Sequence, residues 1–198
     1  MRFRTAAFAV FAVAASSNAA HTHEFIESAG FLNGFLHPLL VPSHALTVLA
    51  FGLMTGQQDK PHRLFLAILF PAIILAGILM SMSATFPLDI VPMILLACGA
   101  ASGLLTALAR PLPLIVPAAI LATGGLSLIF DSVPSVVSKL DSILALAGTT
   151  LGATLTLGLA AYAVARLTRD WQRIGVRILG SWTAASALLV LALQYVNR

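Results

Sequence analysis

Six long apolar stretches follow one another along the chain and determine its class. They lie at about residues 36–56, 64–82, 90–108, 112–130, 143–165 and 174–195. A helix needs about 20 apolar residues to cross a bilayer. Only 9% of the 198 residues are charged, whereas a soluble domain carries about 25%. The sequence therefore predicts an all-α, polytopic membrane protein with six transmembrane helices in contact with the lipid bilayer.

The first 20 residues have the pattern of a cleaved signal peptide. Arg2 and Arg4 form a short basic region, residues 6–15 form an apolar core, and small residues follow. A core of this length is typical of signal peptides and is too short to span a bilayer. We therefore expect residues 1–20 to be removed and residues 21–198 to form one six-helix domain. A retained N-terminal anchor is the alternative.

The basic residues divide unevenly between the two sets of loops and predict the orientation. Beyond the signal peptide, seven lie in the loops after the first, third and fifth stretches: Lys60, Arg63, Arg110, Arg166, Arg169, Arg173 and Arg177. Cytoplasmic loops carry the excess of Lys and Arg. We expect a multi-pass protein of the bacterial inner membrane with both mature termini in the periplasm. The net charge of +4 is spread over short loops, so nucleic acid is not an expected partner.

Small residues recur at a four-residue spacing in two of the stretches. Gly99 and Gly103 lie in the third, and Gly148 and Gly152 lie in the fifth. Such pairs allow helix backbones to approach closely. We interpret them as packing positions within the bundle, and a homo-oligomer remains the alternative.

Two histidines, His37 and His44, lie in the first apolar stretch. No charged residue occurs between Glu27 and Asp59. A histidine within a membrane is costly and usually faces the bundle interior or a water-filled path. The spacing of seven places both on one helical face, about 10 Å apart along a straight helix. That separation is too large for one ion with metal–nitrogen bonds of about 2 Å.

Pro42 changes this geometry, because it lacks an N–H and its ring clashes with the preceding turn. We expect a kink or break there, with Pro38 in the first turn of the helix. Transporters use broken helices for ion sites, and imidazole suits nickel, cobalt, copper and zinc. We interpret His37 and His44 as ligands on a divalent metal path from outside. In the alternative, His37 meets interfacial water and His44 bonds a backbone carbonyl.

Two more histidines, His21 and His23, follow the predicted cleavage region. If cleavage follows Ala20, the free amine and His23 would suit square-planar capture of Cu(II) or Ni(II). A disordered polar N-terminus is the alternative. The chain has no recognisable catalytic or phosphate-binding motif. We therefore expect neither an enzyme nor a resident cofactor.

The run from Gly34 to Gly52, with His37-Pro38 and then His44, resembles the first-helix signature of the HupE/UreJ family. These are nickel or cobalt permeases linked to hydrogenase and urease maturation. The signal peptide, the histidine-bearing N-terminus and the six stretches are similar as well. The resemblance implies a secondary permease for nickel or cobalt ions, with possible metalloenzyme-maturation partners.

The chain departs from the family pattern at two places. Ser43 stands where the family has the aspartate of an Asp-His pair. The fourth stretch lacks the histidines of the second family motif, and Asp131 at its outer end is the nearest acidic residue. A hydroxyl is a much weaker ligand for a divalent ion than a carboxylate. A membrane-embedded accessory subunit without transport is therefore the alternative function.

Overall fold

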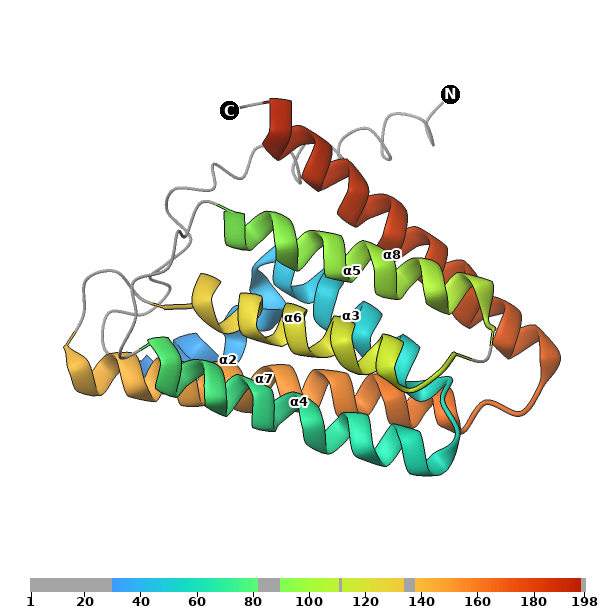
Figure 1. Cartoon of the computed structure of the whole chain (residues 1–198), viewed down its shortest axis with the longest axis horizontal. Helices are drawn as coiled ribbons and strands as arrows, with labels where there is room; N and C mark the ends of the chain where they lie inside the picture. The colour runs from blue at the N-terminus through green and yellow to red at the C-terminus, as the bar shows by residue number, and fades with distance from the viewer. Residues whose placement is uncertain (1–29, 82–89, 111, 134–137, 197–198) are drawn as a thin grey trace, which may run out of the picture.

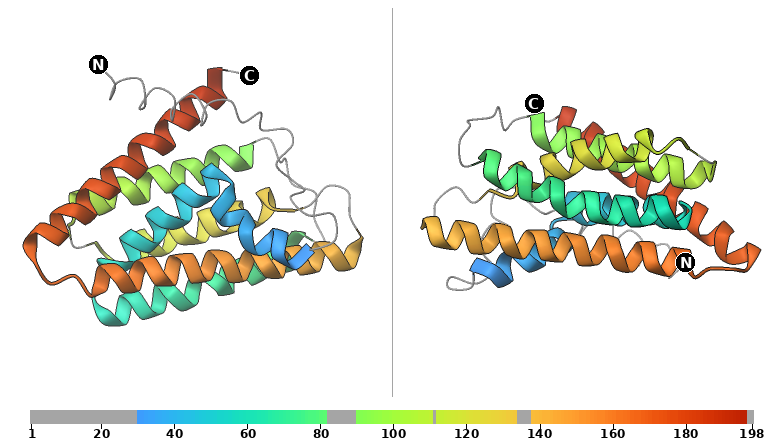
Figure 2. Two further views of the ribbon diagram at one scale, coloured as in Figure 1. Left: turned by 180° about the vertical axis from the view of Figure 1, so that it is seen from behind. Right: turned by 60° about the horizontal axis from the view of Figure 1, so that its bottom comes forward.

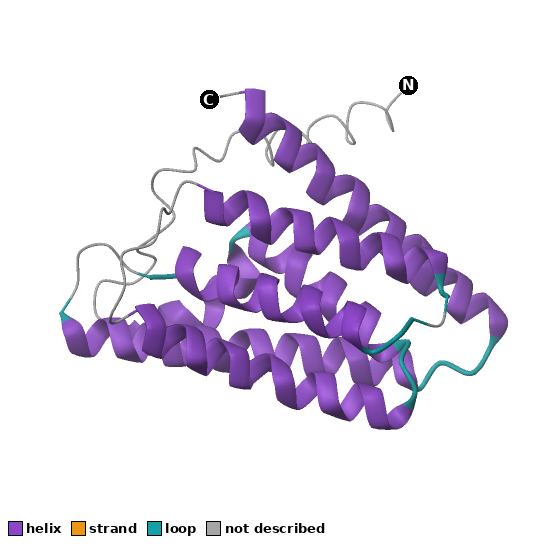
Figure 3. Cartoon of the chain, viewed as in Figure 1, coloured by secondary structure: helices purple, strands orange, loops and turns teal. Residues whose placement is uncertain are grey.

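A computed structural model describes residues 30–81, 90–110, 112–133 and 138–196, and every regular element within them is a helix (Figure 3). The helices are α2 (Gly30–Leu40), α3 (Pro42–Gly56), α4 (Lys60–Ser81), α5 (Val91–Leu108), α6 (Ile115–Asp131), α7 (Lys139–Ala165) and α8 (Asp170–Val196). The predicted all-α architecture is confirmed. The predicted signal peptide, His21 and His23 lie outside the described residues.

The helices run between two ends of one bundle (Figure 1). At the right of Figure 1, the C-terminal ends of α3, α5 and α7 meet the N-terminal ends of α4, α6 and α8. The seven basic residues therefore lie together at this end, which we call the basic end. Four of them, Lys60, Arg63, Arg173 and Arg177, lie in the N-terminal turns of α4 and α8 and not in loops as predicted. The other end holds the start of α5 and the end of α6. This arrangement agrees with the prediction that the loops after the first, third and fifth apolar stretches lie on one side of the membrane.

The chain is a multi-pass membrane protein. Four described helices, α4, α5, α7 and α8, are long and apolar enough to span a membrane. Together α2 and α3 pass the same test, but they meet at an angle of 72° and form a broken span or a re-entrant loop. The apolar helix α6 has 17 residues, or about 25 Å, against a hydrocarbon core of about 30 Å. The described residues thus provide four or five candidate spans, and six stays a prediction.

The first apolar stretch is broken at Pro42, as predicted (Figure 2). Val41 has an extended backbone, with φ −82° and ψ 114°, and Pro42 opens α3. Its missing N–H has no intrahelical partner at that position, so the proline costs little there. The predicted place of Pro38 is wrong, because α2 begins at Gly30 and Pro38 lies in its interior. The apolar residues before 36 extend the helix beyond its predicted start.

Helix α2 is fixed against α7 by its backbone. Pro38 cannot donate a hydrogen bond to the carbonyl of Gly34, four residues earlier. The hydroxyl of Thr149 on α7 donates to that oxygen instead, at 3.2 Å. A Cβ atom added at Gly34 would overlap the backbone of Ala145, and one at Gly148 would overlap the backbone of α2. The two helices therefore touch without intervening side chains.

The predicted packing role of the four glycines is confirmed. Gly99 packs against Thr47 of α3, Gly103 packs against Gly180 of α8, and the pair on α7 packs against α2. In each place the nearest atoms belong to another helix of the same chain. These contacts build the bundle itself, and an oligomer stays untested.

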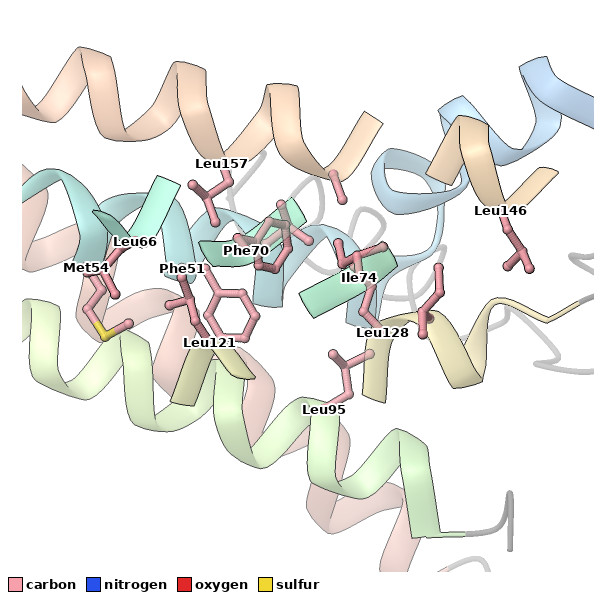
Figure 4. Packing of buried hydrophobic residues seen from close by; sticks show 13 residues of the cluster. Phe51, Met54, Leu66, Phe70, Ile74, Leu95, Leu121, Leu128, Leu146 and Leu157 are labelled. Carbon is pink, nitrogen blue, oxygen red and sulfur yellow. The ribbon is translucent and has the colours of Figure 1, made fainter. Parts of the chain in front are cut away.

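Helix α3 is the central helix of the bundle. Ten of its 15 residues are buried, and all six other helices contact it. Phe51 at its middle meets the ring of Phe70 edge to face, with centroids 5.9 Å apart. Leucines from α5, α6 and α7 complete this apolar core (Figure 4). A polar side chain on the inner face of α3 is thus far from water and needs a partner.

Ala109 ends α5 in the left-handed conformation, with φ 50°. A Cβ atom costs about 1 kcal/mol there, and glycine is the usual residue. We expect Ala109→Gly to stabilise the purified protein by about 0.5–1 kcal/mol, measured by unfolding in detergent. The control Ala101→Gly, inside α5, should destabilise it by a similar amount. Shifts of the same sign in both variants would contradict this reading of the cap.

Candidate functional site

The break at Pro42 brings the two membrane histidines together. The ring centroids of His37 and His44 are 4.7 Å apart, and the rings are inclined at 74°. On a straight helix the residues would be about 10 Å apart along the axis. Two imidazoles on one ion, at about 2 Å, would have centroids about 4.5–5 Å apart. The bend therefore gives the rings a separation that suits a single shared ion.

His44 forms a hydrogen bond with a carboxylate across the bundle. Its Nε2 atom lies 2.7 Å from Oδ2 of Asp131, the last residue of α6. The side chain of His44 is buried, whereas that of Asp131 is 25% exposed. A backbone carbonyl as the partner of His44 was the alternative interpretation, and it is wrong. The histidine uses an acidic side chain 87 residues further along the chain.

This hydrogen bond determines which nitrogen of His44 is available. An ionised carboxylate can only accept, so Nε2 donates the proton to Asp131. In the neutral ring Nδ1 then carries a lone pair. This Nδ1 atom is buried and has no hydrogen-bond partner among the described residues. Metal-ligating histidines typically donate their other N–H to a carboxylate, which orients the ring and makes it more basic.

The described residues supply only part of a metal coordination sphere. Within them, no group of three or more His, Cys, Asp or Glu side chains is placed to hold a metal ion. Asp131 is engaged at Nε2 of His44, on the other side of the ring from Nδ1. Two imidazole nitrogens with water ligands would give a weak, open site. His21 and His23 are outside the described residues, so their relation to this pair stays a prediction.

Polar groups continue along the contact of α3 with α5, which run parallel toward the basic end (Figure 1). The Thr47 hydroxyl donates to the Leu95 carbonyl at 3.4 Å. The hydroxyl oxygens of Thr55 and Ser102 are buried without a hydrogen-bond partner in the described part of the chain. Leaving such groups unsatisfied costs about 1–3 kcal/mol each. This cost falls where the two hydroxyls hydrogen-bond to buried water.

Asp131 is the candidate site residue that the sequence-based site lacks. In the sequence it is the nearest acidic residue to the fourth stretch, whereas the predicted ligands are all histidines. One signal was available, because a carboxylate at the end of an apolar stretch usually has a partner within the bundle. The carboxylate beside His44 thus comes from another helix and not from position 43.

Comparison with known proteins places the chain in a family. Residues 8–190 match a family model described as HupE / UreJ protein. No curated protein and no solved structure matches the chain. The matched range includes His37, His44 and Asp131 and nearly all of the described helices. The chain belongs to the HupE/UreJ family.

Proposed function

We propose that the protein is a secondary permease that carries nickel or cobalt ions across the bacterial inner membrane into the cytoplasm. The observation that carries this proposal is that the imidazole rings of His37 and His44 have centroids 4.7 Å apart. Asp131 accepts a hydrogen bond from Nε2 of His44. Nitrogen ligands suit these metals. The family, associated with nickel and cobalt transport or with urease and hydrogenase maturation, supports the same substrate class.

The orientation in this proposal follows from the basic end. Because cytoplasmic loops carry the excess of Lys and Arg, the basic end faces the cytoplasm. The histidine pair and Asp131 then lie toward the periplasm, as do both mature termini after removal of the signal peptide. An arriving ion meets the histidines first, and the hydroxyls of Thr55 and Ser102 lie further inward. His21 and His23 would gather ions outside.

The chemistry required is ligand exchange, and the protein catalyses no reaction and needs no resident cofactor. A hydrated divalent ion exchanges water for imidazole nitrogen at the histidine pair. Asp131 keeps the proton of His44 on Nε2 and contributes negative charge beside the ion. Both effects favour binding, and the small number of protein ligands favours release. Metalloenzyme-maturation proteins would receive the metal on the cytoplasmic side.

Uptake of radioactive nickel and cobalt tests this function. The host should lack its own high-affinity importers, and all variants should be matched for membrane expression. We expect wild type to accumulate metal, and we expect the double variant His37→Ala/His44→Ala to lose at least nine-tenths of this uptake. The control is His62→Ala, which removes a histidine at the basic end. Equal uptake in wild type and in the double variant would refute the proposed path.

A second candidate function is an accessory membrane subunit without transport. The observation in its favour is that no three-ligand group occurs among the described residues. This function predicts no uptake in any variant and no nickel or cobalt binding above background in calorimetry of the purified protein. The permease predicts binding that depends on His44.

A further inference from the structure

A cavity of about 630 Å³ opens at the basic end. Its walls come from the ends of α3, α5 and α7, from the starts of α4 and α8, and from the short connections between them. Its charged lining residues are Arg63, Arg110, Arg173, Arg177, Asp59 and His62. Four arginines from α4, the α5–α6 connection and α8 thus line one space.

The charge in this cavity favours an anion. Among the described residues that line it, Asp59 is the only acidic one, and its Oδ1 atom already lies 2.6 Å from Nδ1 of His62. The four arginines therefore line the cavity with little compensation from acidic side chains. Such an array attracts an anion through Coulomb interaction. The cavity is accordingly unlike the histidine pair at the other end of the bundle.

Two of the arginines are held in place by the backbone. Arg63 donates from Nη1 to the carbonyl of Gln58 at 3.3 Å, and Arg177 donates from Nε to the carbonyl of Ala107 at 2.9 Å. A guanidinium has five N–H donors, so each keeps donors for a ligand. Planar, positioned guanidinium groups match the oxygen geometry of phosphate and can bind it through two parallel hydrogen bonds.

Aromatic residues place the cavity at the membrane surface. Tyr162, which is 59% exposed, lies one turn before the α7 wall of the cavity, and Arg166 stacks over its ring at 4.8 Å. Trp171, 65% exposed, lies in the first turn of α8 beside the lining residue Arg173. Exposed Tyr and Trp are enriched at the level of lipid headgroups. The cavity therefore opens where phosphodiester groups are concentrated.

We propose that this cavity is a binding site for a phosphate group, supplied by the headgroup of an anionic phospholipid in the cytoplasmic leaflet. Soluble phosphate offers the same chemistry, and the experiment distinguishes the two sources. The proposal does not depend on metal transport. A bound headgroup would join the start of α4, the α5–α6 connection and the start of α8 through one anion.

The test compares two double variants of the full-length protein in detergent. Arg110→Gln/Arg173→Gln removes two exposed arginines that line the cavity, and Arg166→Gln/Arg169→Gln removes two from the same end that do not. Both variants lose the same charge. Native mass spectrometry would measure bound phosphatidylglycerol, with phosphatidylcholine as the neutral comparison. A parallel titration would add inorganic phosphate alone.

We expect wild type to bind phosphatidylglycerol over phosphatidylcholine, with affinity about tenfold weaker in the cavity variant and nearly unchanged in the control variant. Binding of inorganic phosphate with the same dependence on the cavity arginines would also support the site and would identify phosphate itself as sufficient. Equal losses in the two double variants would overturn the proposal, since they would indicate unspecific charge attraction. Absence of any preference for an anionic probe in wild type would overturn it too.

Discussion

Replacing Gly148 with alanine is expected to displace α2 from α7 or to unfold the protein. The added Cβ atom would overlap the carbonyl oxygen of Phe31 and would lie 2.7 Å from the amide nitrogen of Phe35. Both are backbone atoms of α2, so no side chain can rotate out of the way. Overpacking costs about 1–3 kcal/mol, and a clash with backbone atoms falls at the upper end of this range. This cost exceeds the gain of about 1 kcal/mol in helix propensity. We expect a clear loss of thermal stability in detergent and a lower yield of folded protein.

The matched control lies on the same helix. A Cβ atom at Gly158 would meet nothing within 4 Å, so Gly158→Ala should leave stability unchanged or raise it by up to about 1 kcal/mol. If folded Gly148→Ala protein can be purified, its nickel affinity should fall, because α2 carries His37. Equal stability of the two variants would show that α2 does not lie on α7 as described.

Replacing Asp131 with asparagine is expected to weaken metal binding 10-fold to 100-fold, the usual effect of losing the carboxylate behind a ligating histidine. The asparagine amide can donate to Nε2 of His44. The ring proton then moves to Nδ1, and Nδ1 no longer has a lone pair for a metal ion. The negative charge beside the ion is lost as well. Calorimetry with nickel would measure the affinity, and uptake at low nickel concentration should fall in parallel.

The control for this prediction is Asp141→Asn. Asp141 lies at the same end of the bundle, where it accepts a hydrogen bond from the hydroxyl of Ser138 at 2.6 Å. The Asp141→Asn variant should bind nickel with the wild-type affinity. A similar loss in both variants would mean that surface charge at this end, rather than the bond to His44, determines binding.

Much of the helix arrangement could be predicted from the sequence, because it depends on residues that lie close together in the chain. The helical class and the two ends of the bundle were predictable because apolar length and the positions of Lys and Arg are properties of short segments. The break at Pro42 was predictable because proline acts on its own turn. The packing of Gly99 and Gly148 followed from the four-residue spacing that places small residues on one helical face.

The parts that were missed depend on residues far apart in the chain. The bond between His44 and Asp131 joins the start of α3 to the end of α6, and no spacing within either helix indicates it. The place of Pro38 was wrong for a related reason. A proline inside α2 is acceptable only because Thr149, on a different helix, satisfies the carbonyl of Gly34. Tertiary partners therefore decided both outcomes.

Because the helix is broken at Val41, the seven-residue interval between His37 and His44 does not place them on one face of a continuous helix. It sets the length of chain that joins the two rings across the corner. One arm of the corner is held on α7 at Gly34, and the other is held at the centre of the bundle. The two imidazoles are joined by a fixed length of chain between two anchored arms. One inserted residue would turn His37 by about 100° around its helix and direct its ring away from His44. The corner thus tolerates a change of side chain far better than a change of length.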